Sequence, residues 1–211
     1  MEAIIMDHKS GCAFCGKKLL YIDHPEEMRC MFCEAIFSSQ AKCVNNHFVC
    51  DMCHSLSAND LIQRFAINSA FKDPLHMAIV LMKSPSVKMH GPEHHFLIPS
   101  VLLSTFCNSS GRANEKAKMI EKARQRAEKV LGGFCGFYGS CGAAVGTGIF
   151  VSILTGATPL SRDEWKLSNL MTADSLHVIA HAGGPRCCKR NTFLAILEAT
   201  RFVKERLRVE F

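Results

Sequence analysis

Four pairs of metal-ligand residues fill the first quarter of this chain and constrain its fold more than any other feature. Each pair is separated by two or three residues: Cys12 and Cys15, Cys30 and Cys33, Cys43 and His47, Cys50 and Cys53. A C-x2-C turn lets both sulfurs reach one ion, and tetrahedral zinc takes four thiolate or imidazole ligands. The spacing therefore predicts two closed structural zinc sites in a segment too small to fold on apolar burial alone.

Two pairings of these ligands are compatible with the spacing. The stretch from Cys30 to Cys53 resembles the middle of RING and wider treble-clef domains. That resemblance implies one site of Cys30, Cys33, Cys50 and Cys53 and another of Cys12, Cys15, Cys43 and His47. In this chain the remaining cysteine pair, Cys12 and Cys15, lies upstream of the stretch from Cys30 to Cys53. RING domains carry their final cysteine pair downstream of the corresponding stretch. The alternative is a zinc ribbon of Cys12, Cys15, Cys30 and Cys33 with a compact second site, and we favour the interleaved arrangement. His24 and His54 are expected on the surface.

Composition favours a globular protein of a reducing compartment. The chain has 211 residues, 12 of them cysteine, with 48% hydrophobic and 21% charged residues. The N-terminal stretch MEAIIMDHKSGCAF lacks the pattern of a signal peptide, so we expect a cytoplasmic protein whose cysteines bind metal or work as thiols. The uncharged span 130–161 contains many glycines and only a short apolar run. It predicts a buried helix and no membrane insertion.

The density of cysteine falls sharply near residue 54. We therefore predict an α+β protein with a two-site zinc module at 1–56 and a mainly α-helical bundle domain at 57–211. Short runs such as KKLLYI and AIFSS read as small strands. The later part reads as eight helices. They include two separate ones, after Ser161 with Glu164 and from Thr172, and a long last helix starting at Pro185.

The stretch GGPRCCKR sets two thiols side by side near the start of that last helix. With Pro185 at the first helical position, Cys187 and Cys188 fall in the first turn, where free N–H groups and the helix dipole favour a thiolate. Arg186, Lys189 and Arg190 add positive charge. The sequence predicts a site that holds negative sulfur.

A second stretch, GGFCGFYGSCG, repeats this pattern. Its glycines permit a turning backbone close to a ligand, and Cys141 is predicted at a helix start. Cys135, Cys141, Cys187 and Cys188 together could bind an iron–sulfur cluster or work as a redox or sulfur-carrying set. Cys107, on an apolar helix, reads as a packing residue.

Histidines supply further candidates. The stretch MHGPEHH offers His94 and His95 for proton transfer or metal binding. His177 and His181 share a helix face at four-residue spacing and read as a packed or half-exposed pair.

The whole chain resembles an uncharacterised family of cysteine-rich proteins from anaerobic microbes. The stretches that carry the resemblance are HGPEHHFLIPSVLL, GGFCGFYGSCGAAVGTGIF and GGPRCCKR, beside the cysteine-rich head. It implies an anaerobic setting and no established reaction. The segment CGAAVGTG is also similar to the Cys-Gly-Ala-x-x-Gly stretch of a small helical family associated with redox chemistry.

The sequence thus predicts a cytoplasmic metalloprotein with two zinc ions and thiol-based redox or sulfur-transfer chemistry in the helical domain, alone or through an iron–sulfur cluster. Cys187 or Cys188 is expected as nucleophile or ligand and Cys135 and Cys141 as partners, with Arg186 stabilising charge and His94 or His95 moving protons. One alternative is a non-catalytic adaptor that binds a protein or RNA. The positively charged residues of 112–129 favour this alternative. Another is a metal or sulfur chaperone.

Overall fold

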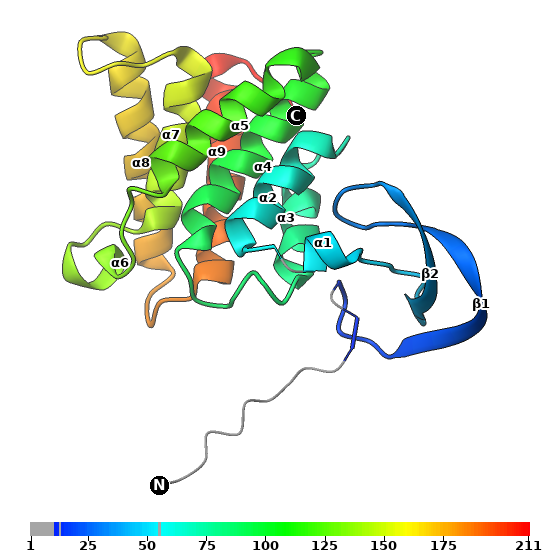
Figure 1. The fold of residues 1–211 in the computed structure, drawn as a ribbon. Helices are drawn as coiled ribbons and strands as arrows, with labels where there is room; N and C mark the ends of the chain where they lie inside the picture. The colour runs from blue at the N-terminus through cyan, green and yellow to red at the C-terminus, as the bar shows by residue number, and fades with distance from the viewer. Residues whose placement is uncertain (1–10, 13, 55) are drawn as a thin grey trace, which may run out of the picture.

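The computed structural model describes residues 11–12, 14–54 and 56–211. The expectation about a signal peptide falls mostly on residues 1–10, outside this range. The described chain has an N-terminal head built on one hairpin, followed by a bundle of helices (Figure 1). The prediction of an α+β protein with a mainly helical domain is confirmed.

The head contains the two strands expected from the sequence. β1 (Leu19–Arg29) pairs antiparallel with β2 (Ile36–Cys43), and the register shifts between Tyr21 and Glu26. The turn between the strands carries Cys30 and Cys33. A short helix, α1 (Asp51–His54), follows the hairpin. The ligand residues therefore sit on turns and element ends, where the backbone is free to bend around an ion.

Eight helices follow the head. Their bounds are α2 (Ala58–Asn68), α3 (Pro74–Lys83), α4 (Glu93–Ser109), α5 (Ala113–Ala127), α6 (Phe134–Phe137), α7 (Gly142–Thr155), α8 (Asp163–His181) and α9 (Cys188–Leu207). The capping residues expected at two starts are confirmed. The Ser57 hydroxyl accepts from the Asp60 N–H, and the Asp73 carboxylate accepts from Leu75 and His76.

Two expectations about helix ends are wrong. Residues 163–181 form one helix, because Thr172 lies inside α8 and its hydroxyl donates to the Ser168 carbonyl instead of capping a new helix. Ser161 does not cap α8 either, since its hydroxyl accepts from the Thr158 N–H. The last helix begins at Cys188, three residues after Pro185, with Cys187 at the N-cap.

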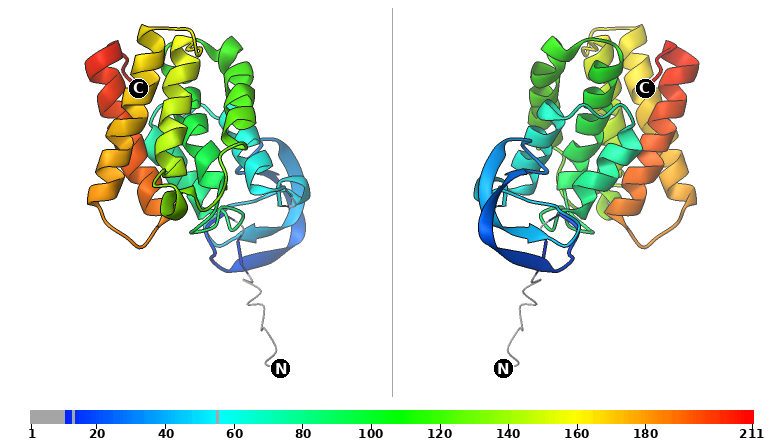
Figure 2. Two further views of the ribbon diagram at one scale, coloured as in Figure 1. Left: turned by 90° about the vertical axis from the view of Figure 1, so that its left-hand side faces the viewer. Right: turned by 90° about the vertical axis from the view of Figure 1, so that its right-hand side faces the viewer.

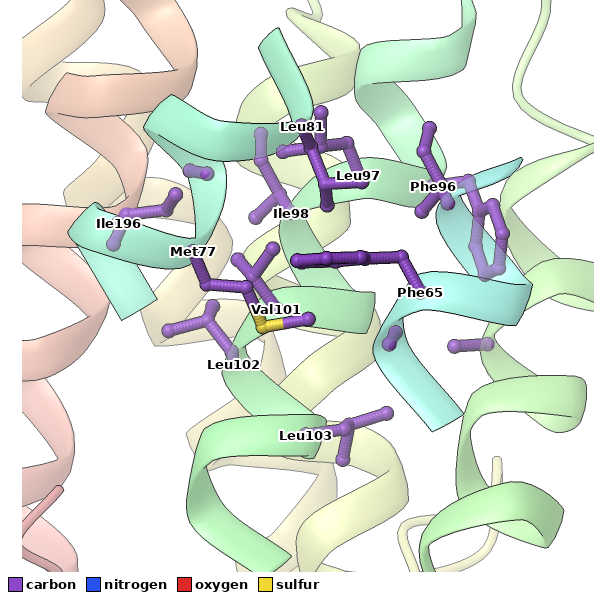
Figure 3. Packing of buried hydrophobic residues seen from close by; sticks show 14 of the residues in the cluster. Phe65, Met77, Leu81, Phe96, Leu97, Ile98, Val101, Leu102, Leu103 and Ile196 are labelled. Atoms are coloured by element: carbon purple, nitrogen blue, oxygen red, sulfur yellow. The ribbon is translucent and has the colours of Figure 1, made fainter. Parts of the chain in front are cut away.

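The core of the body is centred on α4, which is buried along nearly its whole length. Phe96, Leu97 and Val101 contact residues from the surrounding helices, including Phe65 of α2, as Figure 3 shows. Pro99 lies inside α4, where it cannot donate to the carbonyl of His95. Burying this apolar surface stabilises the body.

Small residues let α7 approach two neighbours closely, as their four-residue spacing predicted. A Cβ on Gly146 would lie 3.0 Å from the His95 carbonyl oxygen on α4. One on Gly148 would lie 2.0 Å from the Thr172 hydroxyl on α8. α7 is therefore the buried helix expected in the uncharged span. Among the described residues, no helix has the length and apolar character needed to span a bilayer.

The head packs against one side of the bundle, next to α2 and α3 (Figure 2). The ring of Phe32 in the head lies 6.1 Å from the ring of Phe65 in α2, and Lys83 of α3 lies over the ring of Phe14. These contacts join the buried residues of head and body into one cluster. The boundary between residues 56 and 57 stays a prediction.

Candidate metal centres and a thiol pocket

The eight head ligands form two groups, each of which could hold a metal ion. Within each group, one donor atom per residue lies within 4.8 Å of all the others. The groups are Cys12, Cys15, Cys43 and His47 in one, and Cys30, Cys33, Cys50 and Cys53 in the other. The interleaved pairing is confirmed, and the ribbon alternative is excluded because Cys12 and Cys30 belong to different groups.

The sulfur spacing in both groups fits a tetrahedral ion. The Sγ atoms of Cys33 and Cys50 are 3.8 Å apart, and those of Cys15 and Cys43 are 3.4 Å apart. Four sulfurs at about 2.3 Å from a tetrahedral ion stand ~3.8 Å from one another. The head therefore already holds its ligands at metal-binding distance.

His47 supplies a second sign of a ligand site. Its Nδ1 is buried and has no hydrogen-bond partner among the described residues. Such an atom costs free energy unless something binds it. Burial lowers the pKa of His47, and the charges of Lys83 and Lys17 lower it further, so the ring is held neutral as a metal ligand requires.

Backbone N–H groups point at the head sulfurs. The N–H of Phe14 donates to Cys12 Sγ at 3.4 Å, that of Asn45 to Cys43 at 3.4 Å, and that of Cys50 to Cys30 at 3.5 Å. Burial by itself would raise the pKa of Cys30, but such N–H groups lower it to about 7. The N–H groups also lower the pKa of Cys43, whereas at Cys12 burial outweighs them and raises the pKa to about 11. The thiolate, which is the form that binds metal, is therefore favoured at Cys30 and Cys43.

Neither spare histidine of the head joins these groups. His24 lies exposed on β1, as expected. The side chain of His54 is outside the described part.

In the body, three of the four predicted thiols line one pocket. Cys135, Cys141 and Cys188 face a cavity of about 290 Å³, together with His94, His95 and Arg186. The glycine-rich turn and the α8–α9 connection, which carry these thiols, lie at the same end of the bundle (Figure 1). The two cysteine-bearing stretches therefore meet at this pocket, as a shared cluster or thiol set would require.

Cys187 does not line this pocket. A chain of contacts fixes the start of α9 so that Cys188 faces inward. His94 bonds Thr192 through Nδ1 at 2.8 Å and the Lys88 carbonyl through Nε2 at 2.8 Å, while Thr192 donates to the Cys188 carbonyl. Both ring nitrogens of His94 are thus engaged, Nδ1 with α9 and Nε2 with the segment that connects α3 and α4. Of the two adjacent thiols, the structure gives the pocket only Cys188.

His95 presents a free nitrogen to the pocket. Its Nδ1 donates to the Val130 carbonyl at 3.0 Å, and it has 9% of its surface exposed. Its pKa is lowered by burial, so the imidazole is neutral and Nε2 carries a lone pair. A Cβ on Gly142 would lie 2.2 Å from this ring, so glycine is needed there.

Asn191 is a site residue that the sequence reasoning missed. Its Nδ2 donates to Cys141 Sγ at 3.5 Å, which ties α9 to the start of α7. Asn191 and Thr192 follow Cys188 by three and four residues, so helical spacing places them on the same face of α9. This spacing could have identified Asn191 as a site residue from the sequence, if the start of α9 had been known.

Three helix N-termini converge on the pocket. α4, α7 and α9 each contribute residues of their first turn or cap to its wall, and no Asp or Glu is among the residues that line it. Glu93, also at the start of α4, instead accepts from the Lys88 N–H at 2.8 Å. The free N–H groups and dipoles of these helices make the pocket favourable for negative charge.

The sequence predicted that Arg186, Lys189 and Arg190 all place positive charge near the thiols, but the structure differs. Lys189 donates to the Met82 carbonyl at 2.5 Å, and Arg190 donates to the Gly183 carbonyl at the end of α8. Only Arg186 of the three lines the pocket. Burial raises the pKa of the Cys188 thiol, with Cys141 and Cys135 adding to this and the Gly91 N–H and Arg186 opposing it. Cys188 is therefore a neutral thiol here, and the predicted thiolate is wrong at this residue.

Other candidates outside the pocket have structural explanations. The Cys107 thiol is fully buried and donates to Met119 Sδ at 3.7 Å, so its role in packing is confirmed. His177 and His181 stack on the exposed face of α8 with ring centroids 4.4 Å apart.

The basic segment 112–129 is largely satisfied within the chain. Arg112 pairs with Glu115, Arg124 pairs with Asp60 and Glu128, and Arg126 donates to Ser152. Lys116 is buried and donates to the Ser69 carbonyl. The charge signal for RNA binding is weakened, because four of the seven cations in this segment are engaged internally.

Comparison with known proteins places the chain in a family. Residues 62–211 match DUF5714, a family of unknown function, and the chain belongs to it. No curated protein and no solved structure matches the chain. The predicted membership of an uncharacterised cysteine-rich family is confirmed, and the match covers the whole thiol pocket. The anaerobic setting stays a prediction.

Proposed function

We propose that this is a cytoplasmic redox protein in which two zinc ions stabilise the head and the thiol pocket of the body is the reacting site. The observation that carries the proposal is the convergence of Cys135, Cys141 and Cys188 on one cavity beside the free Nε2 of His95. Residues far apart in the chain build this cavity, and the family match spans all of them.

Zinc is the metal that fits the head best. Both groups offer four soft or borderline donors at tetrahedral spacing, and closed sites of this composition are structural. When bound, one zinc ion would join the segment before β1 to the end of β2 and the turn after it. The other would join the turn between β1 and β2 to the start of α1. The ligands leave no coordination position for a substrate, which directs chemistry to the body.

The body pocket has the groups that redox chemistry on sulfur requires. The Cys188 thiol is neutral at rest because burial raises its pKa, and His95 can accept a proton at Nε2. The helix N-termini favour the negative charge that forms when a thiol ionises. Cys188 is the central thiol, with Cys135 and Cys141 as partners. Sulfur transfer by the same thiols is the variant of this chemistry in which the oxidant is a small persulfide.

The proposed function can be tested by substituting Cys187 and Cys188 separately, because the two thiols are adjacent and only Cys188 lines the pocket. Zinc-loaded protein, purified without oxygen, is titrated reversibly between dithionite and a mild thiol–disulfide buffer, and the electrons taken up per chain are counted. We expect reversible uptake in the wild type and in Cys187→Ser, and its loss in Cys188→Ser. Zinc content is followed throughout to exclude oxidation of the head.

Two results contradict the proposal. One is the absence of reversible uptake in the wild type while both zinc ions remain bound. The other is equal uptake in Cys188→Ser and wild type.

A further inference from the structure

We infer that the thiol pocket binds an iron–sulfur cluster whose ligands are Cys135, Cys141, Cys188 and His95, with the adjacent Cys187 left out. This inference rests on the proposed redox function of the same site and names its cofactor. With the cluster bound, the cluster carries the electrons and Cys188 and His95 Nε2 are its ligands, whereas without it these groups act as the reacting thiol and the proton acceptor. It changes the ligand set expected from the sequence, in which four cysteines shared the cluster.

The donors of the pocket are of the kind that binds metal. Three sulfurs and one imidazole nitrogen line it. His95 is about nine-tenths buried, and its Nδ1–H is given to the Val130 carbonyl, so the lone pair of Nε2 is left for a ligand. Metal-bound histidines typically donate their other ring N–H to a carbonyl in this way. The orientation of His95 therefore suits ligation.

The positions of the donor atoms in the pocket favour a cluster over a single metal ion. In the described chain, the head groups are the two sets of three or more donors that lie within 4.8 Å of one another, and the pocket residues form no such set. A single tetrahedral ion needs sulfurs ~3.8 Å apart. In a [4Fe–4S] cluster each ligand binds a different iron atom, so the ligands stand farther apart than around a single ion. The cavity of about 290 Å³ between the donors provides that space.

The charge of the pocket matches an anionic cluster. Ligation removes protons from three thiols and leaves negative sulfur. The N-termini of α4, α7 and α9 and the guanidinium of Arg186 offset this charge, and no carboxylate lines the cavity. The Asn191 N–H donated to Cys141 Sγ is a hydrogen bond of the kind that tunes cluster potentials.

A route of entry is present beside the site. A second hollow of about 530 Å³ runs toward α8 and shares Cys135, Cys141, Arg186 and Asn191 with the pocket. Cys135 sits on α6, between Gly133 with φ 88° and Gly139 with φ 64°. These glycines allow a turn that brings one ligand to the cavity from outside the bundle.

The experiment compares single substitutions in the full chain. Zinc-loaded protein is supplied anaerobically with ferrous iron and sulfide, then desalted. Iron, acid-labile sulfide and zinc are counted, and absorption and electron paramagnetic resonance spectra are recorded before and after reduction. Helix content is measured by circular dichroism for every variant. The variants are Cys188→Ser, Cys187→Ser as the matched control, His95→Gln and His95→Cys.

We expect the wild type and Cys187→Ser to hold iron and sulfide at equal, multiple stoichiometry with unchanged zinc. Cys188→Ser should lose most of both while keeping its helix content. His95→Cys should keep the cluster with a lower reduction potential and an altered resonance spectrum, because thiolate replaces a neutral ligand. His95→Gln should lose iron to a chelator at least tenfold faster than the wild type.

Four outcomes overturn the inference. They are a wild type without iron and sulfide, a single bound ion without sulfide, equal loss in Cys187→Ser and Cys188→Ser, and spectra and chelator rates that do not respond to either change at His95. If the wild type holds no iron but still shows electron uptake that requires Cys188, the cluster is wrong and the proposed thiol function stands.

Discussion

The head and the body bring cysteines together by opposite means. In the head, all ligands lie between residues 12 and 53, on turns of one hairpin and its flanks, and their donor atoms are already within metal-binding distance. In the body, the thiols come from segments separated by up to about fifty residues and are placed by helices that pack on α4. A bound metal would stabilise the fold of the head, whereas the fold of the body creates its site.

The largest expected effect is the unfolding of the head while the body stays folded. Cys43→Ser should release one zinc ion and unfold the hairpin, because a structural zinc site contributes on the order of 10 kcal/mol to folding. The body should keep its helices, since its core is built by α4 and its neighbours. Zinc analysis, limited proteolysis and circular dichroism measure these three quantities.

Cys187→Ser is the control for this experiment, since that thiol belongs to neither head group. Retention of both zinc ions in Cys43→Ser, or a complete loss of helix content, would contradict the contrast between head and body.

An intermediate effect is expected in the body pocket. Gly142→Ala places a Cβ 2.2 Å from the ring of His95, and such overpacking costs ~1–3 kcal/mol. The Tm should fall while the zinc content stays unchanged. Gly136→Ala is the matched control, because a Cβ there would have no heavy atom within 4 Å. Equal Tm values for the two variants would show that the contact between α4 and α7 does not constrain the pocket.

The smallest effect is a dependence of body stability on pH. Burial lowers the pKa of His94 and of His95 below the ordinary value of about 6.5, so the unfolded chain binds protons that the folded chain refuses. The free energy of unfolding should therefore fall as the pH drops below about 6.5, and the loss is complete below the folded pKa values.

Urea unfolding of iron-free protein between pH 8 and 5 measures this slope. Trp165, the single tryptophan, lies on α8 and reports on the body. His95→Gln should flatten the slope, and His177→Gln, whose ring is exposed, should leave it unchanged. An unchanged slope in His95→Gln would show that this ring is not held neutral by burial.

The elements that follow from local sequence could be predicted. The head ligands and their pairing depend on turns of two or three residues, and helix starts such as Ser57 and Asp73 depend on side chains that cap their own N–H groups. The meeting of the two glycine-rich turns was also predicted. For the ligand turns and the helix caps, the deciding interaction lies within a few residues. The two cysteine-bearing turns, in contrast, meet through contacts between segments about fifty residues apart.

Long-range contacts decided what could not be predicted. Pro185 suggested a helix start, but α9 begins at Cys188, where Lys189 reaches the Met82 carbonyl and His94 reaches Thr192. That shift determines which of two identical thiols faces the pocket. Likewise, Thr172 was expected at a helix start from the sequence but lies inside α8, where it packs against α7 at Gly148. Burial of Cys188, which removes the expected thiolate, also depends on residues distant in sequence, because Cys135 and Cys141 line the same pocket.

The positions of the ligands along the chain set an order of maturation. The last head ligand is Cys53, whereas the pocket needs Asn191 and the start of α9 before its wall is complete. Because a chain emerges from the ribosome with its N-terminal part first, the head can acquire its ions while most of the body is still being synthesised. A cofactor of the body can be inserted only after translation is nearly finished, so a cell can supply the two kinds of centre from separate sources at separate times.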